Sequence, residues 1–521
     1  MHTAVTQPLL FQRLLNWLGA KARENRVPLL AAFSFGFLAH MFAFTNKLLN
    51  HDEVKSLFSK GGTVVLGRWG LGALDCLFPN VSMPWIYGLM TIALLAVAVC
   101  VLIHCLELQS SWAQVLAAGF VLTFPSLTGT FGYMFTSSCY GVAFLLAAVA
   151  AWLLKKQDWR HWLCALVCMV LSLSIYQAYI SLTAGVLILM LLQALLKGED
   201  TPRVFRRGIA YVVFLALALG AYYGATQVIL RLKHIRMGSY AVDSIAFDPL
   251  SLPANILLAY RYFFRYFREG AMGLIPSPLS RWLHPVLLIF AAVLLVLRLT
   301  ERKQDVPGLL LLAALIALLP LAVNCMFLFT TVDAIHTLVL YGFVSVYLLV
   351  LLLADGCFSH PAAKKWREGL RRLSLNAIAI LSAAIVLINV YIANASYLTL
   401  QLRYENACAF YTSLIADIKM MPEFTEGTRL AVIGTWDDPD FYEENLNFTN
   451  ILTGVTGFKP DSYSKEAFLQ YYLGFSIPMA SAQEQAQIAA SPEYAEMPVY
   501  PYYGSLRKIG DTLVVKLSQP A

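Results

Sequence analysis

The sequence of 521 residues contains few charged side chains. Only 13% of its residues are Asp, Glu, Lys or Arg, whereas soluble domains contain about 25%. A chain of this length built as three or four soluble domains could not cover their surfaces with so few polar groups. The composition therefore excludes a soluble enzyme and a disordered chain, and the 59% of hydrophobic residues indicates a membrane protein.

The cysteines lack the spacing of a disulfide framework or of a zinc site. Most of the nine lie inside apolar runs, as Cys164 and Cys168 do. Cysteines in such runs behave as small hydrophobic residues. We therefore expect neither a disulfide scaffold nor a bound metal or cofactor.

Long apolar runs dominate the sequence. A helix needs about 20 mostly apolar residues to cross a membrane. Eleven segments approach this length, although Pro125 and Gly129 are expected to break the stretch 112–154. The fold class is therefore mainly α and polytopic. The expected spans are 28–45, 84–106, 112–128, 138–154, 160–176, 178–196, 208–230, 283–299, 308–328, 335–354 and 374–393.

Basic residues are distributed unevenly between alternate loops. With a cytoplasmic N-terminus, the inner segments collect seventeen Lys and Arg residues and the outer loops eleven. Since inner loops are enriched in basic residues, we expect the N-terminus inside and, after an odd number of spans, the C-terminus outside. Three parts result: an amphipathic cytoplasmic helix in 1–27, a transmembrane domain in 28–394 and an extracytoplasmic domain in 395–521.

The C-terminal part differs from the rest in charge. Residues 395–521 contain eight basic and fifteen acidic residues, a net charge of −7, which leaves +14 on the remainder. The basic charge of residues 1–394 is suited to contact with anionic lipid or phosphate, and the acidic charge of residues 395–521 is typical of a solvated domain. We therefore expect no nucleic acid partner. A helix at 397–420, a strand at 430–434, a helix at 465–472 and a strand at 512–517 predict a small α/β fold.

The first outer loop places two acids directly after the first span. Asp52 and Glu53 lie at the expected membrane surface, where loss of hydration increases the proton affinity of a carboxylate. Such a group is a candidate general base; the alternative is a solvated loop acid. Lys55 follows, and Arg68 and Trp69 lie in a glycine-rich turn. Arg68 either orients the base or a phosphate or contacts lipid headgroups, and Trp69 either stacks on a sugar or is an interfacial aromatic.

The second outer loop is rich in basic residues. Arg261, Arg265 and Arg268 follow each other at helical spacing, with aromatic residues on the remaining surface, which is typical of a helix in the membrane interface. Such a helix binds anionic headgroups in one interpretation and clamps a lipid-linked phosphate in the other. Because the positive-inside rule disfavours outer basic residues, their concentration in two loops favours the clamp. We assign the clamp to Arg231, Lys233, Arg236 and Arg265.

Short motifs along nearly the whole chain carry a family resemblance. They are Asp52-Glu53, Gly67-Arg68-Trp69, Phe135-Thr136-Ser137-Ser138-Cys139-Tyr140, Tyr222-Tyr223, Tyr404-Glu405-Asn406-Ala407 and Arg429-Leu430-Ala431-Val432-Ile433-Gly434. In these motifs the sequence resembles the serotype-converting glucosyltransferase family of bacterial membrane proteins, a branch of the GT-C glycosyltransferases.

The resemblance implies a sugar donor linked to polyprenyl phosphate and transfer to a surface glycan such as O-antigen, at the outer face of the bacterial cytoplasmic (inner) membrane. Asp52 then takes the role of catalytic base, with Glu53 as neighbour or substitute. Many GT-C enzymes hold the lipid phosphate with an arginine in a late outer loop, but residues 330–336 have Asp333 and His336 and no arginine. Independently of the resemblance, Tyr133, Tyr176 and Gln177 lie near outer helix ends, where such residues either line a sugar pocket or pair with each other between helices. His336 is a further candidate substrate-binding residue.

Transfer from a phosphate-linked sugar needs one general base, because the phosphate leaves as a stable anion. Fixed cations can stabilise that anion without a metal, and a single displacement inverts the anomeric carbon. A lipid-linked glycan transporter or flippase is an alternative that would place charges within the spans. A glycan polymerase with a diphosphate-linked donor is a third hypothesis. The spans contain almost no charge, which favours the transferase over the transporter.

Overall fold

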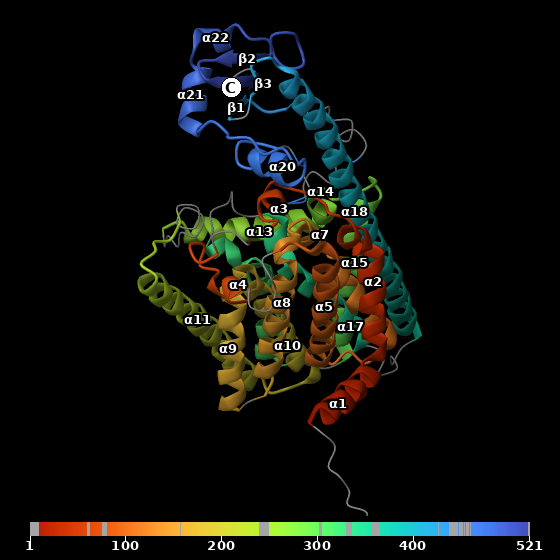
Figure 1. Cartoon of the computed structure of the whole chain (residues 1–521). Coiled ribbons are helices and arrows are strands. Elements are labelled where there is room, and N and C mark those ends of the chain that lie inside the picture. Colours follow the sequence, from red (N-terminus) through yellow and green to blue (C-terminus); the bar gives the residue numbers. More distant parts are fainter. Residues whose placement is uncertain are drawn as a thin grey trace, which may run out of the picture.

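The larger part of the protein is a bundle of apolar helices. The computed structural model describes residues 10–59, 63–74, 81–156, 158–238, 250–301, 305–329, 336–356, 365–425, 427–436 and 460–518, and positions 446, 452, 454 and 458. Because the hydrocarbon core has no water to pair with backbone groups, apolar runs form helices that satisfy their own hydrogen bonds. Figure 1 shows these helices side by side, with the C-terminal domain at one end of the bundle and α1 at the other.

Nine helices in the described ranges are long and apolar enough to cross a membrane, or ten if the bent pair α6 and α7 is one span. α9 is apolar but has only 17 residues. Every predicted span overlaps one of these helices, while the count of eleven and the orientation stay predictions. The helices are α2 (Arg26–Thr45), α5 (Pro84–Leu106), α6 (Ser111–Thr123), α7 (Pro125–Phe131), α8 (Met134–Leu154), α9 (Trp159–Ile175), η2 (Gln177–Tyr179), α10 (Ile180–Lys197), α11 (Thr201–Leu232), α15 (Leu283–Glu301), α16 (Val306–Val323), η6 (Thr337–Phe343), α17 (Val344–Asp355) and α18 (Lys365–Met420).

A proline bends the third span. α6 and α7 meet at an angle of 43°. Pro125 begins α7, and Phe124 before it is extended, because a proline ring disfavours helical geometry in the preceding residue. The break predicted at Pro125 is confirmed. The break predicted at Gly129 is wrong, since this residue lies inside α7 and the residues on both sides of it are helical.

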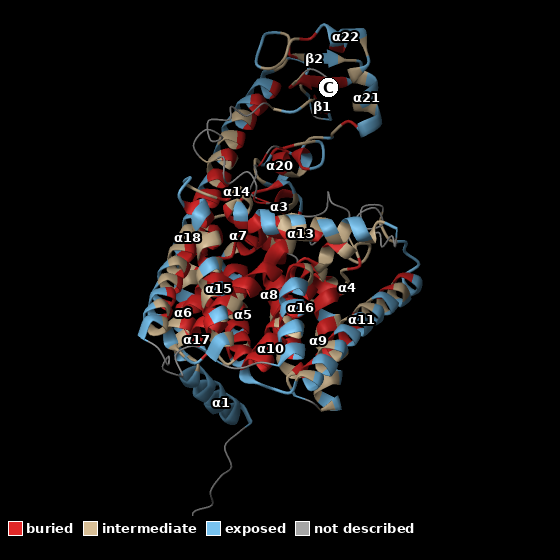
Figure 2. Cartoon of the chain, turned by 180° about the vertical axis from the view of Figure 1, so that it is seen from behind, coloured by how far each residue is buried: buried red, intermediate tan, exposed pale blue. Residues whose placement is uncertain are grey.

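Small residues allow the helices to pack closely. Ala147, Ala148 and Ala151 of α8 are fully buried where α8 lies against α5 and α9. At Gly88 of α5, a Cβ would lie 2.2 Å from the Cβ of Phe44 on α2. Close contact of this kind drives helix association in lipid, where hydrophobic burial gives little gain. Figure 2 shows buried residues through the middle of the bundle and exposed ones on outer helices such as α11 and α16.

An amphipathic helix crosses the end of the bundle that carries the C-terminal domain. Figure 1 shows this helix, α13, lying across the spanning helices. Its Phe263, Tyr266 and Phe267 are buried, whereas the three arginines of the predicted stripe are exposed. Phe264 is 62% exposed, so the predicted division of faces holds for three of the four aromatic residues. The elements at this end are α3 (His51–Lys55), α4 (Trp69–Ala73), α13 (Leu252–Arg268), α14 (Gly270–Gly273), η3 (Ser280–Trp282) and η4 (Cys325–Leu328).

The N-terminal helix α1 (Leu10–Glu24) lies at the opposite end of the molecule (Figure 1). None of its residues is buried. Leu10, Leu14 and Leu18 are exposed, as are Arg13 and Lys21. Exposed apolar and basic side chains on one helix suit a position in the membrane interface, as predicted for residues 1–27.

One helix connects the bundle to the C-terminal domain. α18 has 56 residues and continues past the expected domain boundary at residue 394 (Figure 1). The predicted strands 430–434 and 512–517 correspond to β1 and β3 and the predicted helix to α20, whereas β2 was not predicted. The sheet has the order β1-β3-β2, with β3 parallel to β1 and antiparallel to β2. The elements are β1 (Arg429–Ile433), α20 (Lys465–Tyr471), α21 (Ala482–Ala489), α22 (Pro492–Ala495), β2 (Leu506–Ile509) and β3 (Thr512–Lys516).

Candidate active site

The acid pair lies on α3, a short helix soon after the first span. Asn50 caps this helix, because its side-chain oxygen accepts hydrogen bonds from the amides of Asp52 (3.0 Å) and Glu53 (2.8 Å). The side-chain amide of Asn50 also donates to the carbonyls of Gly132 (2.5 Å) and Gly454 (3.3 Å). Asn50 therefore holds α3 between the turn that joins α7 to α8 and the C-terminal part of the chain.

Glu53 is fully buried, and its carboxylate accepts hydrogen bonds from several donors. Lys47 and the hydroxyl of Ser82 both donate to Oε1, and Lys47 also donates to Ser82 Oγ (2.7 Å). The backbone amide of Phe135, at the start of α8, donates to Oε2 (3.2 Å). A buried carboxylate requires such partners. Glu53 thereby attaches α3 to the bundle.

Asp52, the neighbour of Glu53, is partly open. Its side chain is 37% exposed, against 0% for Glu53. His51 Nε2 lies 3.5 Å from its carboxylate. Lys55 Nζ lies 3.8 Å from the centre of the Tyr463 ring. Burial and then the charge of Asp52 raise the pKa of Tyr463, so its hydroxyl is protonated and can donate at neutral pH.

α3 also packs into the core of the C-terminal domain. Leu49 and Val54 are fully buried in one cluster with Phe468 and other residues of that domain. Phe58 contacts Tyr471 of α20 edge to face, with ring centres 5.4 Å apart. The acid pair therefore lies at the junction of the bundle and the C-terminal domain, where Figure 1 shows α3 below α20.

A tight turn brings Trp69 to the end of the bundle that carries the C-terminal domain. Gly67 has a φ of 72°, a left-handed conformation that glycine adopts without strain. At Gly70, a Cβ would lie 2.1 Å from Ser174 Oγ, so α4 approaches the end of α9 only because glycine stands there. The indole of Trp69 donates to Thr226 Oγ1 of α11 (3.2 Å). The glycines of the motif thus set the position of the residues between them.

Arg68 lies among aromatic side chains. Its Nη1 donates to Tyr140 OH (3.2 Å), and its guanidinium carbon lies 5.3 Å from the centre of the Tyr176 ring. Tyr140 and Tyr176 stack with ring centres 4.3 Å apart. Burial and then the charge of Arg68 lower the pKa of His336 to about 4, so this imidazole is neutral at physiological pH. A guanidinium near neutral side chains is suited to bind an anion.

The two outer loops meet beside Arg68. Gln177 Nε2 donates to Tyr222 OH (2.8 Å), which donates to the carbonyl of Gly67 (3.0 Å). The amide of Gly238, beyond α11, donates to the carbonyl of Val65 (3.0 Å). Four of the predicted residues therefore share one region of the structure. They are Arg68, Tyr176, Gln177 and His336.

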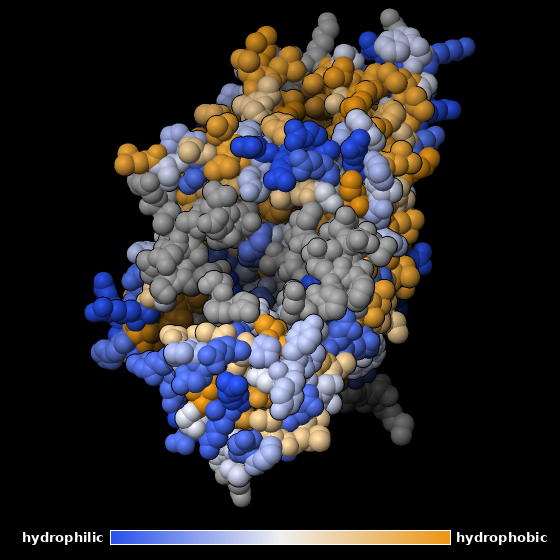
Figure 3. Space-filling model, turned by 90° about the horizontal axis from the view of Figure 1, so that it is seen from above, coloured by the Kyte–Doolittle hydropathy of each residue, from blue (hydrophilic) through white to orange (hydrophobic). Residues whose placement is uncertain are grey.

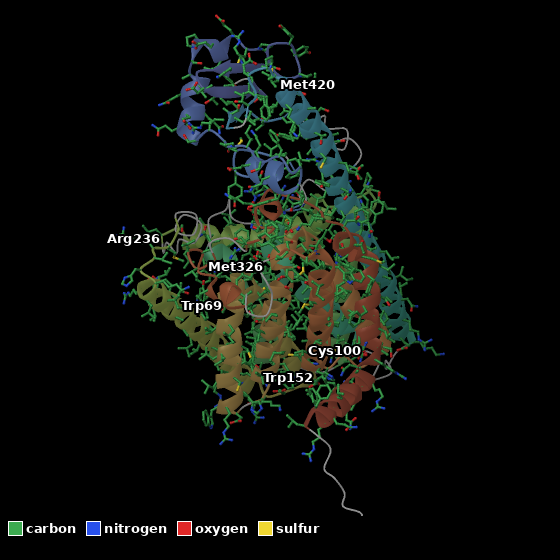
Figure 4. All side chains as sticks on the ribbon, viewed as in Figure 1. Trp69, Cys100, Trp152, Arg236, Met326 and Met420 are labelled. Carbon is green, nitrogen blue, oxygen red and sulfur yellow. The ribbon has the colours of Figure 1, made fainter. Side chains whose placement is uncertain are left out.

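The predicted clamp residues of the second loop are exposed. Arg231, Lys233 and Arg236 lie at and beyond the end of α11, and Figure 4 shows Arg236 at the edge of the molecule and Trp69 further in. Arg265 on α13 forms an ion pair with Glu269 (2.7 Å). These cations are therefore exposed at the surface of the protein, whereas Arg68 is half-buried in the bundle.

Tyr133, predicted to line the sugar pocket, packs against the C-terminal part. A Cβ at Gly454 would lie 2.5 Å from its ring, so the contact depends on that glycine. Asp333 lies outside the described residues. Figure 3, a view onto the end of the molecule that carries the C-terminal domain, shows hydrophilic side chains near the middle of this face. Within the described ranges, no three His, Cys, Asp or Glu side chains are grouped so as to hold a metal ion.

A family model described as "Glucosyl transferase GtrII" matches residues 41–349, which is more than half of the chain. The chain belongs to this glucosyltransferase family. The resemblance inferred from the short motifs is thereby confirmed. No curated protein and no solved structure matches the chain significantly.

The region that matches this glucosyltransferase family contains α3, α4, α13 and every predicted site residue from Asp52 to His336. Family membership and the apolar helices together indicate a membrane glycosyltransferase. The C-terminal domain, including Tyr463, lies beyond the matched region.

Proposed function

We propose that the protein transfers a sugar, glucose by family, from a polyprenyl-phosphate donor to a surface glycan such as O-antigen, at the outer face of the bacterial cytoplasmic membrane. The observation that carries this proposal is the different environment of Asp52 and Glu53. One carboxylate of the pair is partly open at the end of the bundle, and the other is buried and held by three donors. An acceptor hydroxyl can reach Asp52 without disturbing the fold.

The proposed reaction is a single displacement. The acceptor oxygen forms a bond to the anomeric carbon and gives its proton to Asp52, while the bond from that carbon to the phosphate oxygen breaks. Attack from the side opposite the phosphate inverts the anomeric carbon. A positioned general base contributes a rate factor of about 10²–10⁴. The lipid phosphate leaves as a stable anion, so the reaction needs no second carboxylate as acid, unlike glycoside hydrolysis.

We assign stabilisation of the departing phosphate chiefly to Arg68. It is a cation held at Tyr140 and Tyr176 inside the outer end of the bundle, where a fixed charge acts more strongly than in water. The cations of the second loop attract the anionic headgroup to the same face, and the contact of Gly238 with Val65 joins that loop to the Arg68 turn. These cations are Arg231, Lys233, Arg236 and Arg265.

Aromatic and amide side chains beside Arg68 suit the sugar. We propose that Trp69 stacks on the ring and that Gln177 and His336 hydrogen-bond to hydroxyl groups, with Tyr133 on the side of the acceptor. His336 is neutral at physiological pH, as a sugar ligand in a cationic region should be.

The distribution of charge favours this transferase over a transporter. The spans α5, α8 and α16 contain no Asp, Glu, Lys or Arg, and α10 has only Lys197 at its end. A transport path for a charged lipid-linked glycan would need polar or ionisable groups at membrane depth.

The test is transfer by purified full-length Asp52→Asn in bilayers, with a polyprenyl-phosphate sugar as donor. We expect a loss of at least about 100-fold, because asparagine cannot accept the proton. Asp511→Asn, at an exposed turn between β2 and β3, is the matched control and should keep wild-type activity. Full activity in a folded Asp52→Asn protein would remove Asp52 from the mechanism. Use of only a diphosphate-linked donor would indicate the polymerase instead.

A further inference from the structure

A groove lies at the C-terminal end of α13, where this helix meets the start of α15. Its volume is about 770 Å³, within the roughly 300–1,000 Å³ of pockets that hold small molecules. Its charged lining residues are Arg268, Glu269 and Arg281, and the rest of the wall is apolar. The apolar side chains include Phe264, Phe267, Ile275, Trp282, Leu288 and Ile289.

A left-handed turn brings the two arginines of the groove together. All four residues of α14 have positive φ, including 53° at Ala271 and 63° at Met272, a conformation that residues other than glycine rarely adopt. A Cβ at Gly270 would lie 2.5 Å from Cγ2 of Ile275 and 3.0 Å from Cα of Arg281. The chain therefore passes close to Arg281 two residues after Arg268, because glycine stands at position 270.

The groove has a net positive charge. Glu269 pairs with Arg265 (2.7 Å) and with Arg268 (2.9 Å), so one acid faces two arginines. Arg281 adds a third cation, which lies 5.5 Å from the centre of the Trp282 ring. Three arginines and one carboxylate leave a charge of +2, and guanidinium groups match the geometry of a phosphate.

The apolar wall of the groove extends along a helix that can cross the membrane. Phe264, Trp282 and Ile289 are exposed. α15 is long and apolar enough to be a span, and Ile289 lies about 9 Å along it from Leu283, at 1.5 Å per residue. The arginines therefore lie at the level of the lipid headgroups, and the apolar wall continues into the hydrocarbon layer.

The groove is separate from the region of Arg68. α15 packs against α17 and α18, whereas α4, which follows Arg68, packs against α9. Figures 1 and 2 both show α15 beside α18, and α4 beside α9 and α11. A phosphate at Arg268 and Arg281 is therefore a different group from the phosphate that we propose to leave at Arg68.

We propose that this groove binds an anionic membrane phospholipid, whose phosphate contacts Arg268 and Arg281 and whose acyl chain lies along Trp282 and Ile289. Cations beside an apolar wall match the two parts of such a lipid. The bound lipid holds the end of α13 at the membrane surface. This inference is independent of the proposed transfer reaction.

The experiment compares two lipids that carry a photoreactive group in the acyl chain, phosphatidylglycerol and phosphatidylcholine. Each is added as a minor component to full-length protein in bilayers of ordinary phosphatidylcholine, and mass spectrometry locates the label after illumination. We expect the phosphatidylglycerol probe to label residues 264–289 roughly tenfold more than the phosphatidylcholine probe. Unlabelled phosphatidylglycerol should remove this label, and polyprenyl phosphate should do so only at higher concentration.

A double variant tests the two arginines. Each basic residue near an anionic lipid increases binding about fivefold, and Glu269 offsets part of this gain. We therefore expect Arg268→Gln/Arg281→Gln to reduce labelling by the phosphatidylglycerol probe about tenfold. The matched control is Arg507→Gln/Lys508→Gln, which removes the same charge from exposed positions of β2 and should label as wild type does.

Three results would overturn the inference. One is equal labelling of the groove by both probes in wild type, a comparison that does not depend on any variant. Another is the same loss of label in both double variants, which would show a general effect of charge. The third is removal of the label by polyprenyl phosphate at a lower concentration than by phosphatidylglycerol, which would assign the groove to the donor. None of these results bears on Asp52, because labelling does not measure transfer.

Discussion

Replacing Glu53 with glutamine should destabilise the protein more than it impairs the chemistry. The Glu53 carboxylate is buried, and it accepts hydrogen bonds from Lys47, Ser82 and the amide of Phe135. Glutamine has the same shape but no charge, so Lys47 loses its counter-charge. The new amide group also brings N–H donors to a place where only donors surround it.

The burial of Glu53 and Lys47 determines how much stability Glu53→Gln should lose. Removing one partner of a buried ion pair costs about 3–5 kcal/mol. The Lys47 side chain is 26% exposed and can reach water, so we expect about 2–3 kcal/mol for Glu53→Gln. Lys47→Met leaves a fully buried carboxylate without a cation. This variant should therefore lower the free energy of unfolding by about 3–5 kcal/mol. The double variant Glu53→Gln/Lys47→Met removes both charges and should be more stable than Lys47→Met alone. A double-mutant cycle of these variants measures the interaction energy of the pair.

The assay is unfolding of the purified full-length variants in micelles, followed beside transfer activity in bilayers. We expect Glu53→Gln to unfold more easily and, where it stays folded, to keep most of its activity. Wild-type stability of Glu53→Gln together with complete loss of transfer would refute this reasoning. The buried carboxylate would then be the reacting group, and the roles of Asp52 and Glu53 would be exchanged.

Three further variants test the surroundings of the site. Gly70→Ala should lower stability by about 1–3 kcal/mol, because its Cβ would lie 2.1 Å from Ser174 Oγ; Gly220→Ala, with no atom within 4 Å, should unfold no more easily than wild type. Arg68→Lys should lower kcat/KM roughly tenfold, because lysine lacks the planar guanidinium, and unchanged kinetics would exclude Arg68 from stabilising the phosphate. Burial lowers the pKa of Lys465 to about 8 from an ordinary 10.5, so the unfolded chain binds more protons between these values. Unfolding should therefore become harder as pH rises from about 8 to 10 in wild type and not in Lys465→Met.

The lengths of the apolar runs were enough to locate the spanning helices. Each of the eleven predicted runs falls on a helix, because the thickness of the hydrocarbon core sets the length of any segment that crosses it. The same criterion predicted that the last span ends at residue 393. In the structure, α18 continues to Met420. The side chains become more polar at the membrane surface, but a helix can continue through such a change in hydropathy.

Local patterns also located parts of the site. The arginine stripe of α13 followed from helical periodicity, and the pairing of Arg265 with Glu269 four residues later was also readable from spacing. Asn50, two residues before Asp52, is a typical N-cap and is a local signal for the start of α3. Tyr463 carried no comparable signal, because its position beside Lys55 results from the packing of the C-terminal domain against α3, which no local pattern contains.

The sequence by itself determined that this is a polytopic membrane protein, that an acid pair and an arginine turn follow its first span, and that it belongs with membrane glucosyltransferases. These conclusions depend on composition, periodicity and short motifs, which are local properties of a chain. Only the tertiary structure decided which acid is buried and which is open. Burial depends on what packs around α3: Lys47 and Ser82 on the bundle side, and the C-terminal domain with Tyr463 on the other. Two adjacent carboxylates of nearly equal chemistry differ in burial because their surroundings come from distant parts of the chain.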